Sequence, residues 1–442
     1  MISWRNEVSM TRDVSYEFVL GKIVVNVLLN LKTDIQKNLI FLFVAGLFFW
    51  ISITLLLPTL PTYIQDVGGT TQQVGLVMGC FAIGLLVSRT WLGKIADQRG
   101  RKLVVLIGAF VAGTAPLGYI FIQSITGLAL VRAFHGISIA AFTIGFSALV
   151  VDCAPRENRG QLIGYMNLAV PVGMSIGPAL GGFLQVRANY PLLFGVSAGC
   201  GLTALILGNQ LDEFKIATAV KPDAQKIKLS KLNQNRSFSE LIRNPALLTP
   251  SIILFLIGFV FGGLVAFLPL YIRSADFVLN AGLFYTVIAI ASFTVRIFIG
   301  KISDNQGRGI LISFSLIFYA ISMFLLAIAN SPAMLLLAAV AEGAGAGILI
   351  PTMLALISDR SYANERGRVY ALCLGGFDVG IAIAGPILGF LTSYVSYRGV
   401  FTINAALAII ALVVFMLKGN KGLMSSWRFA IGKQKDLYNL DV

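Results

Sequence analysis

Four ionisable residues stand inside long apolar segments of this 442-residue chain: Arg132, His135, Glu342 and Asp378. A charged side chain at the centre of a bilayer costs about 2.5–3.5 kcal/mol on insertion scales, so such residues usually face a cavity and carry a function. A fixed cation such as Arg132 can hold an anionic solute or favour the charged form of a nearby carboxyl group. His135, the single histidine of the chain, titrates near neutrality when unperturbed. These residue types suit proton transfer or solute binding.

The two carboxyl groups lie among small residues, AEG at Glu342 and GGFDVG at Asp378. A carboxyl group that close packing removes from water holds a proton more readily, as a proton carrier requires. The alternative for both is a structural salt bridge with an arginine or lysine. For His135 it is an ordinary packed hydrogen-bonding residue, and for Arg132 a side chain near a helix end that reaches water.

The composition requires a membrane to position these groups. Hydrophobic residues make up 57% of the chain and charged residues 12%, against about 25% charged in a soluble protein. A helix needs about 20 apolar residues to span the bilayer, and open strands cannot span it because their backbone groups stay unpaired. We therefore expect an all-α membrane protein with twelve transmembrane helices. The segments are 39–60, 74–96, 103–122, 126–151, 161–184, 190–209, 246–270, 281–302, 310–329, 332–357, 368–391 and 397–417.

Lysine and arginine are concentrated in every second connecting segment and in both terminal segments. By the positive-inside rule those segments, and both termini, are cytoplasmic in a cell membrane. The net charge of +14 is explained by these loops, so no nucleic-acid partner is expected. The four cysteines show no metal-binding spacing, and we expect no metal and no cofactor. The predicted organisation is a cytoplasmic leader (1–38), a six-helix half (39–209), a cytoplasmic linker (210–245), a second six-helix half (246–417) and a cytoplasmic tail (418–442).

An internal repeat joins the two halves. Residues 89–101 read RTWLGKIADQRGR and residues 296–308 read RIFIGKISDNQGR. Six helices per half is an even number, so both halves insert with the same orientation, as in transporters built from parallel repeats. The repeated positions, each 207 residues apart, include Arg89, Gly93, Asp97, Arg101, Asp152 and Arg159, which recur as Arg296, Gly300, Asp304, Arg308, Asp359 and Arg366.

The segment GKIADQRGRK from Gly93 resembles the loop 2–3 signature (G-x-L-a-D-r-x-G-r-k) of the major facilitator superfamily. The resemblance covers nearly the whole chain apart from the leader and the tail. It implies that the repeated residues latch the two halves in one access state and release them in the other. The alternative is a pair of exposed turns that only help to orient the protein. The second copy departs from the signature, with Gly309 at the final basic position.

Two further motifs resemble those of proton-coupled members of the superfamily. The sequence RAFHG from Arg132 is similar to a helix-4 motif (R-x-x-q-G) linked to proton transfer, with His135 in the place of glutamine. Helix 5 carries a motif similar to that of proton-coupled exporters, and the alternative for it is a small-residue packing seam. Many drug–proton exporters also have an acidic residue in helix 1, which this chain lacks. The helix-5 motif consists of Gly173, Gly177, Pro178, Gly181 and Gly182.

We therefore expect a secondary active transporter, a proton-coupled exporter of a small lipophilic or amphipathic solute that works by alternating access as a monomer. The alternatives are a transporter of sugars, glycosides, siderophores or other metabolites on the same fold, and a non-transporting receptor. An enzyme is not expected, because the chain has no nucleophile–base motif and no phosphate-binding loop. The implied partners are the solute, protons and the lipid bilayer.

Overall fold

The computed structural model describes residues 31, 33–154, 159–212, 238–275, 277–362 and 365–440, without the side chains of 159–161, 238 and 300–306. Within these ranges the chain forms helices, and twelve spans are long and apolar enough to cross a membrane. This confirms the predicted all-α fold. Most of the predicted leader and linker lies outside the described residues. Within these two segments, α2 begins at Thr33 and α11 occupies Phe238–Arg243.

The spans form two sets of six, which we call the N half and the C half. The N half contains α2 (Thr33–Leu55) with α3 (Leu60–Asp66), α4 (Thr71–Arg99), α5 (Arg101–Phe121), α6 (Ile125–Cys153), α7 (Arg159–Met166) with α8 (Ala169–Arg187), and α9 (Tyr190–Asn209). The C half contains α12 (Pro245–Ser274), α13 (Ala281–Gln306), α14 (Arg308–Ile328), α15 (Pro332–Asp359), α16 (Arg366–Leu391) and α17 (Tyr397–Lys418). The short α18 (Leu423–Ala430) follows the last span.

Prolines divide two of the spans. Pro58 lies between α2 and α3, and the break at Asn167–Leu168 between α7 and α8 comes just before Pro171. A proline has no backbone N–H, and its ring clashes with the carbonyl group four residues earlier. At the second break Val170 N–H donates to Asn167 at 3.3 Å, one residue short of an α-helical bond. The first and fifth spans are therefore bent, as proline chemistry predicts.

Glycines make the repeated tight turns at one end of the bundle. The chain passes from α4 to α5 at Gly100 with φ of 104°, and from α13 to α14 at Gly307 with φ of 86°. A side chain is strained in this left-handed region of φ, which glycine adopts freely. We call the end of the bundle that carries these turns the motif end.

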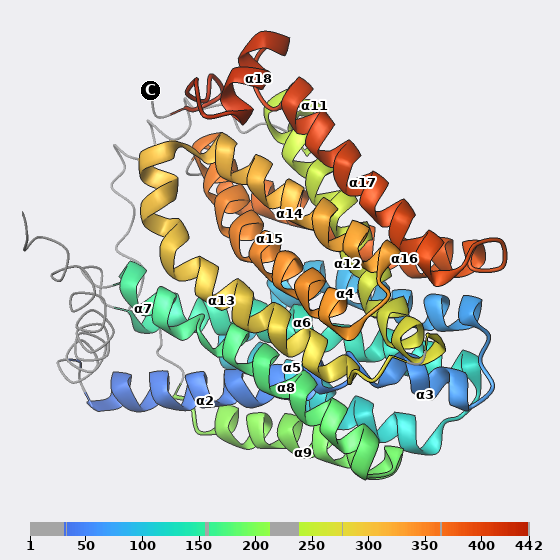
Figure 1. The fold of residues 1–442 in the computed structure, drawn as a ribbon. Helices are drawn as coiled ribbons and strands as arrows, with labels where there is room; N and C mark the ends of the chain where they lie inside the picture. The colour runs from blue at the N-terminus through green and yellow to red at the C-terminus, as the bar shows by residue number, and fades with distance from the viewer. Residues whose placement is uncertain are drawn as a thin grey trace, which may run out of the picture.

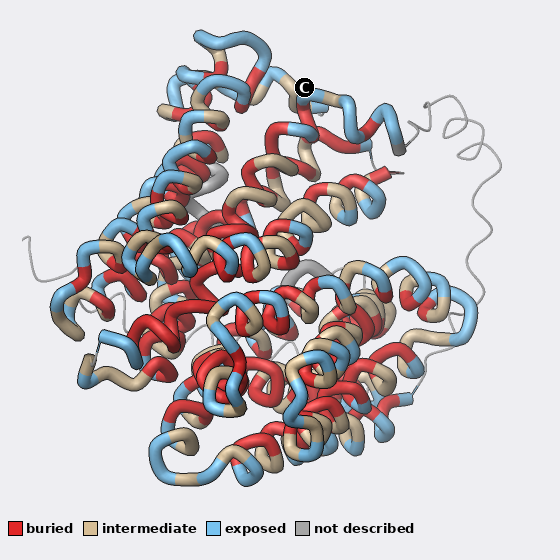
Figure 2. The backbone as a smooth tube through the Cα atoms, turned by 90° about the vertical axis from the view of Figure 1, so that its right-hand side faces the viewer, coloured by how far each residue is buried: buried red, intermediate tan, exposed pale blue. Residues whose placement is uncertain are grey.

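The two halves lie side by side and touch along two seams, α4 against α16 and α8 against α13 (Figure 1). In Figure 1 they are close together at the right, near α3, and diverge toward the left, where α2 and α7 begin. We call the right-hand end the opposite end. Buried residues run along the inside of each half, and exposed residues cover their outer surfaces (Figure 2).

The tail after α17 folds back onto the motif end of the C half. Its anchor is Arg360, at the end of α15, which is 1% exposed. The guanidinium binds both carboxylate oxygens of Asp436, at 2.7 and 3.0 Å. It also donates to the carbonyl oxygens of Ala246 at 2.9 Å and Gly419 at 2.6 Å. One buried cation therefore ties the tail to α12, α15 and the end of α17.

Replacing Asp436 by asparagine is expected to destabilise the C half, because it leaves Arg360 buried without a counter-charge. Breaking a buried ion pair from one side costs about 3–5 kcal/mol. The measurement is thermal unfolding of the purified protein in detergent. Arg428→Gln, which removes an exposed cation of the same tail, should change the free energy of unfolding by less than about 0.5 kcal/mol. Equal melting temperatures for the two variants would contradict the prediction.

Candidate functional site

The seam between α4 and α16 is a backbone-to-backbone contact. A methyl group added at Gly75 would lie 2.1 Å from the carbonyl oxygen of Gly385, and one at Gly79 would lie 2.5 Å from that of Ala382. Helices approach this closely only where side chains are absent or very small. At the opposite end the seam finishes where the Thr71 and Tyr397 hydroxyl groups lie 3.3 Å apart. The halves are therefore pressed together from mid-depth to the opposite end.

An ion pair crosses the same seam deeper in the bundle. Arg89 Nη1 on α4 lies 2.7 Å from Asp378 Oδ2 on α16, and the two side chains are 29% and 12% exposed. A rise of about 1.5 Å per residue places Arg89 about 15 Å inside the end of α4, and Asp378 about 18 Å inside the start of α16. The pair thus brings together a predicted gating residue and a predicted proton carrier near mid-depth. Asp378 therefore also forms the structural salt bridge that the sequence analysis gave as the alternative to a proton carrier.

The second seam, α8 against α13, has polar contacts but no matching ion pair in the described ranges. Thr286 Oγ1 donates to the carbonyl oxygen of Ser175 at 3.1 Å. Asn280 Nδ2 donates to that of Gly182 at 2.7 Å. Arg296, which the repeat relates to Arg89, is exposed. The two halves therefore share one fold, but among the described residues an ion pair crosses only the α4–α16 seam.

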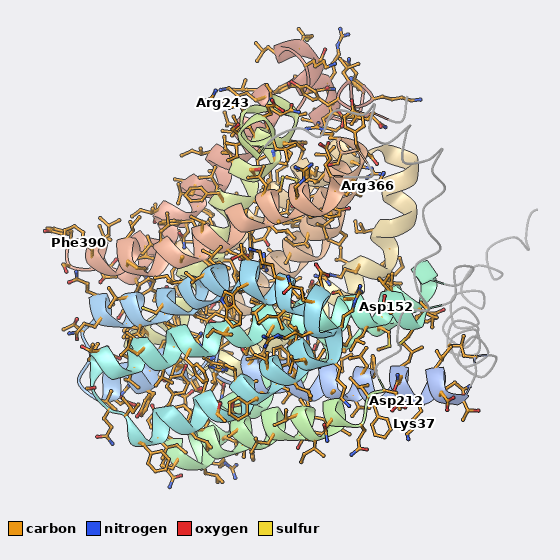
Figure 3. The ribbon with its side chains drawn as sticks, turned by 180° about the vertical axis from the view of Figure 1, so that it is seen from behind. Lys37, Asp152, Asp212, Arg243, Arg366 and Phe390 are labelled. Carbon is orange, nitrogen blue, oxygen red and sulfur yellow. The ribbon has the colours of Figure 1, made fainter. Side chains whose placement is uncertain are left out.

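At the motif end the predicted gating residues pair inside each half. Arg101 lies 3.0 Å from Asp152, and the equivalent Arg308 lies 3.0 Å from Asp359. Figure 3 shows Asp152 and Arg366, from different halves, at this same end. Asp97 is exposed and makes no ion pair with a described residue. The predicted latch between the halves is thus not engaged by these pairs.

The other predicted gating residues at this end make no ion pair between the halves among the described side chains. A methyl group added at Gly93, inside α4, would meet nothing within 4 Å, so no described residue packs closely against this position. Arg366 Nε is buried without a hydrogen-bond partner among the described residues. The side chains of Arg159 and Asp304, and Gly300 with them, lie outside the part of the chain that the structure describes.

The opposite end is closed by an ion pair between the two halves. Arg273 Nη1 on α12 lies 2.5 Å from Asp66 Oδ1 on α3. The Tyr190 hydroxyl group donates to the other oxygen of Asp66 at 2.5 Å. The sequence analysis missed this pair, although both residues follow the repeated segments at Pro61–Ile64 and Pro269–Ile272, which could have placed them at the same end of the bundle.

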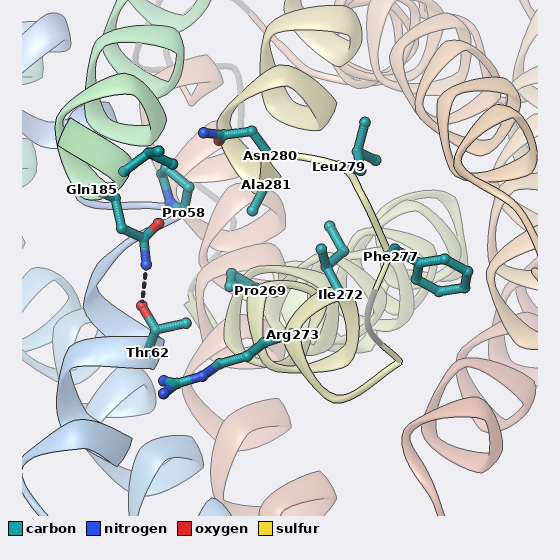
Figure 4. Close-up of a pocket in the computed structure, with 11 residues that line it drawn as sticks. Pro58, Thr62, Gln185, Pro269, Ile272, Arg273, Phe277, Leu279, Asn280 and Ala281 are labelled. Atoms are coloured by element: carbon teal, nitrogen blue, oxygen red, sulfur yellow. Dashed lines mark hydrogen bonds between the residues drawn. The ribbon is translucent and has the colours of Figure 1, made fainter.

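A pocket of about 330 Å³ lies beside this ion pair, with walls from both halves. Figure 4 shows Thr62 and Gln185 on the N-half side, with the hydrogen bond from Gln185 Nε2 to Thr62 Oγ1 of 2.8 Å. Pro269, Arg273 and Asn280 line the C-half side. The pocket is a depression in the closed end and lies away from the predicted proton carriers.

A double-mutant cycle of Asp66→Asn and Arg273→Gln is expected to give a small coupling energy. The two side chains are 33% and 53% exposed, and exposed ion pairs contribute about 0.2–1 kcal/mol. Thermal unfolding of the four proteins measures it. A coupling above about 2 kcal/mol would contradict the expectation for a water-screened pair.

The helix-4 motif, which lies on α6, forms a polar cluster buried within the N half. Arg132 is 5% exposed, and its guanidinium lies 4.2 Å from the centre of the Phe81 ring. His135 is fully buried, with Nδ1 3.2 Å from the Tyr119 hydroxyl group. The Tyr63 hydroxyl group in turn donates to the backbone carbonyl oxygen of Tyr119 at 2.7 Å. Neither Arg132 Nε nor His135 Nε2 has a hydrogen-bond partner among the described residues.

Glu342 occupies the equivalent place in the C half, because it lies 207 positions after His135. It is 1% exposed. Neither carboxyl oxygen has a hydrogen-bond partner in the described ranges. Each half therefore holds one buried titratable group at the same repeat position.

Replacing Glu342 by methionine is expected to leave the protein as stable as before or more stable, by up to about 3 kcal/mol. A buried polar group without partners costs about 1–3 kcal/mol, and methionine removes it at similar volume. Thermal unfolding in detergent measures the change, with Asp378→Met as the comparison, since that variant breaks an ion pair. A marked loss of stability in Glu342→Met would mean that the carboxyl group has a structural partner.

The helix-5 motif, which lies on α8, packs mainly against α2 of its own half. Methyl groups added at Gly173, Gly177 and Gly181 would meet α2 at 2.5, 2.1 and 2.1 Å. Gly182 differs, because its nearest neighbour is the Asn280 side chain of the C half, at 2.0 Å. Pro178 lies inside α8 beside it. The motif is therefore a packing seam that reaches the other half at its last position.

Comparison with known proteins identifies the fold. The sequence model of the Major Facilitator Superfamily matches residues 42–312 and 281–426. The chain belongs to this superfamily. Its members among the relatives below are transporters, so this chain is a multi-pass membrane transporter and not an enzyme.

The matches to several relatives extend over most of the length of each relative. The staphylopine export protein of Staphylococcus aureus is 25% identical over 85% of this chain and 95% of its own. The multi-drug resistance efflux pump PmrA of Streptococcus pneumoniae is 29% identical over 76% of this chain and 84% of its own. A crystal structure of the nucleoside transporter NupG superposes with a TM-score of 0.70 at 14% identity, covering 86% of this chain and 98% of that chain. The last likeness concerns the fold alone.

Proposed function

We propose that this member of the Major Facilitator Superfamily is a proton-coupled exporter of small lipophilic or amphipathic solutes that works by alternating access. The observation that carries the proposal is the Arg89–Asp378 ion pair, 2.7 Å long, which joins the two halves near mid-depth. When the halves move apart along this seam, Asp378 loses its counter-charge. A carboxylate without a counter-charge at that depth is costly, and protonation removes the charge. Proton uptake is thereby coupled to the movement of the halves.

The access state follows from the contacts between the halves. The two halves are joined by Asp66 and Arg273 at the opposite end. At the motif end the described ion pairs stay within their own halves. The lysines and arginines near the turns favour a cytoplasmic motif end, with both termini on that side. In this orientation the structure corresponds to an inward-open state. Export then begins with solute entry from the cytoplasm.

The solute class is supported by relatives and by aromatic side chains. One relative is named a multi-drug efflux pump. Phe134 of α6 is 40% exposed, and the rings of Phe261 of α12 and Phe377 of α16 stack with their centres 6.0 Å apart. Phe49 and Phe267, in contrast, are fully buried in the packing of the halves. A metabolite exporter is the second candidate, because the staphylopine export protein matches over nearly its full length.

The test is a proton-flux assay with the full-length protein in proteoliposomes that hold an imposed pH gradient and a pH-sensitive dye. Lipophilic cations, sugars and other metabolites are added one at a time. Collapse of the gradient by a lipophilic solute, in protein-containing vesicles only, is the expected result. Uptake of a labelled solute that leaves the gradient unchanged would overturn proton coupling. A response to polar metabolites alone would favour the second candidate.

A further inference from the structure

The helix that follows the last span has two different faces. One face of α18 packs on the C half through Ser426, Phe429 and Ala430, all buried. Ser313 Oγ of α14 donates to the carbonyl oxygen of Ala430 at 2.9 Å. The other face is apolar and exposed, and no described residue covers it. Its members are Leu423 at 64%, Met424 at 64% and Trp427 at 48% exposure.

The position of α18 is fixed by its packing against α14 and α17. Both carry a stripe of exposed apolar residues, as a helix that faces lipid does. The α17 stripe ends at Leu417, and α18 begins after a turn at Leu423. The exposed face of α18 therefore lies at the boundary where the bilayer meets water. The stripe residues are Phe314, Ile317, Ile321, Phe324 and Ile328 on α14, and Ile409, Ile410, Val413 and Leu417 on α17.

The surface around this face is positive. Asp436 is the one carboxylate in the sequence from 418 to 440, and Arg360 neutralises it. The cations in the same stretch remain exposed and lie on α18, on the turn before it or on the segment after it. They are Lys418, Lys421, Arg428, Lys433 and Lys435.

We propose that α18 and the residues on either side of it, 418–435, form a binding site for anionic phospholipid at the membrane surface. Leucine, methionine and tryptophan side chains enter the boundary of the acyl chains, and the cations contact the headgroups. Tryptophan is enriched at this level of the bilayer. Because Arg360 and Asp436 hold the tail rigidly to α12 and α15, a lipid bound here contacts the motif end of the C half. The charge complementarity favours anionic lipid over a second protein chain.

The first test uses the full-length protein in vesicles whose lipids carry bromine, which quenches tryptophan fluorescence on contact. The signal of Trp427 is the difference between the wild type and Trp427→Phe. The expected result is strong quenching by bromine near the carbonyl groups and weaker quenching by bromine deep in the acyl chains. Absence of quenching at either depth would overturn the proposal. Quenching that appears only after residues 1–30 are removed would also overturn it, because the leader would then be what covers this face.

The second test measures lipid selectivity. Bromine is placed either on phosphatidylglycerol or on phosphatidylcholine in otherwise identical mixtures, and the ratio of the two quenching signals is taken. We expect the ratio to favour phosphatidylglycerol, and Arg428→Gln with Lys433→Gln to reduce it by up to about fivefold per charge. The matched control removes two exposed cations of the same end, Lys37→Gln with Arg243→Gln (both labelled in Figure 3), and should leave the ratio unchanged. Equal effects of the two pairs would overturn a site on the tail.

Discussion

Replacing Asp378 by asparagine is expected to lower solute-driven proton flux by at least about 100-fold. Asparagine cannot bind and release a proton, and it leaves Arg89 without the carboxylate that now lies 2.7 Å away. Removing one partner of a buried pair costs about 3–5 kcal/mol, and the partial exposure of this pair places the cost at the lower end. The measurement is proton flux in proteoliposomes at equal amounts of inserted protein.

Two comparisons separate coupling from misfolding. The exchanged pair, Arg89→Asp with Asp378→Arg, keeps opposite charges across the seam and should recover the melting temperature that the single variant loses. Arg89→Gln should be much more damaging than Arg296→Gln, because the repeat places both arginines equivalently but only Arg89 faces a carboxylate among the described residues. Proton flux at the wild-type rate in Asp378→Asn would refute the role of this carboxyl group.

Replacing Gly75 by valine is expected to lower transport by about 10- to 100-fold while leaving each half folded. The first added carbon would lie 2.1 Å from the carbonyl oxygen of Gly385 and 3.1 Å from the Phe267 ring, both in the other half. Overpacking costs about 1–3 kcal/mol, and here the cost falls on the state in which the opposite end is closed. Solute uptake and proton flux in proteoliposomes measure the loss.

The matched control is Gly199→Val on α9, where an added carbon would meet nothing within 4 Å. Both substitutions introduce the same β-branched residue into a transmembrane helix, so their effects on helix propensity are equal. The control should transport at close to the wild-type rate. Similar rates for the two variants would show that the α4–α16 seam is not close-packed during the transport cycle.

The sequence by itself determined the class, the number of spans and the repeat. Twelve apolar segments can only be helices in a bilayer, because backbone groups there must pair within the segment. Their even division predicted two parallel halves. The predicted and observed ends differ by a few residues: the first span begins at Thr33 instead of residue 39, since polar residues can extend a helix beyond the hydrocarbon.

The candidate site was predicted only as a set of residue types. Arg132, His135, Glu342 and Asp378 stood out because ionisable groups in apolar segments are costly. Their spacing along the chain places Arg132 and His135 on one helix face and Glu342 in the other half, but it could not show that His135 meets Tyr119 or that Asp378 meets Arg89. These are contacts between helices, and a one-dimensional pattern does not specify which faces of two helices meet.

Tertiary structure alone decided how the halves meet and where the tail goes. The motif pairs could bridge the halves or stay within them, and they stay within them because the halves diverge toward the motif end. Asp66 and Arg273 meet because the two halves are in contact at the opposite end. The tail, polar enough to be predicted as a plain terminal segment, docks because Arg360 is buried and needs a counter-charge, which Asp436 supplies. Whether each of these charged side chains pairs depends on how far it is removed from water and on which partner lies near it. Both are set only when the helices pack together.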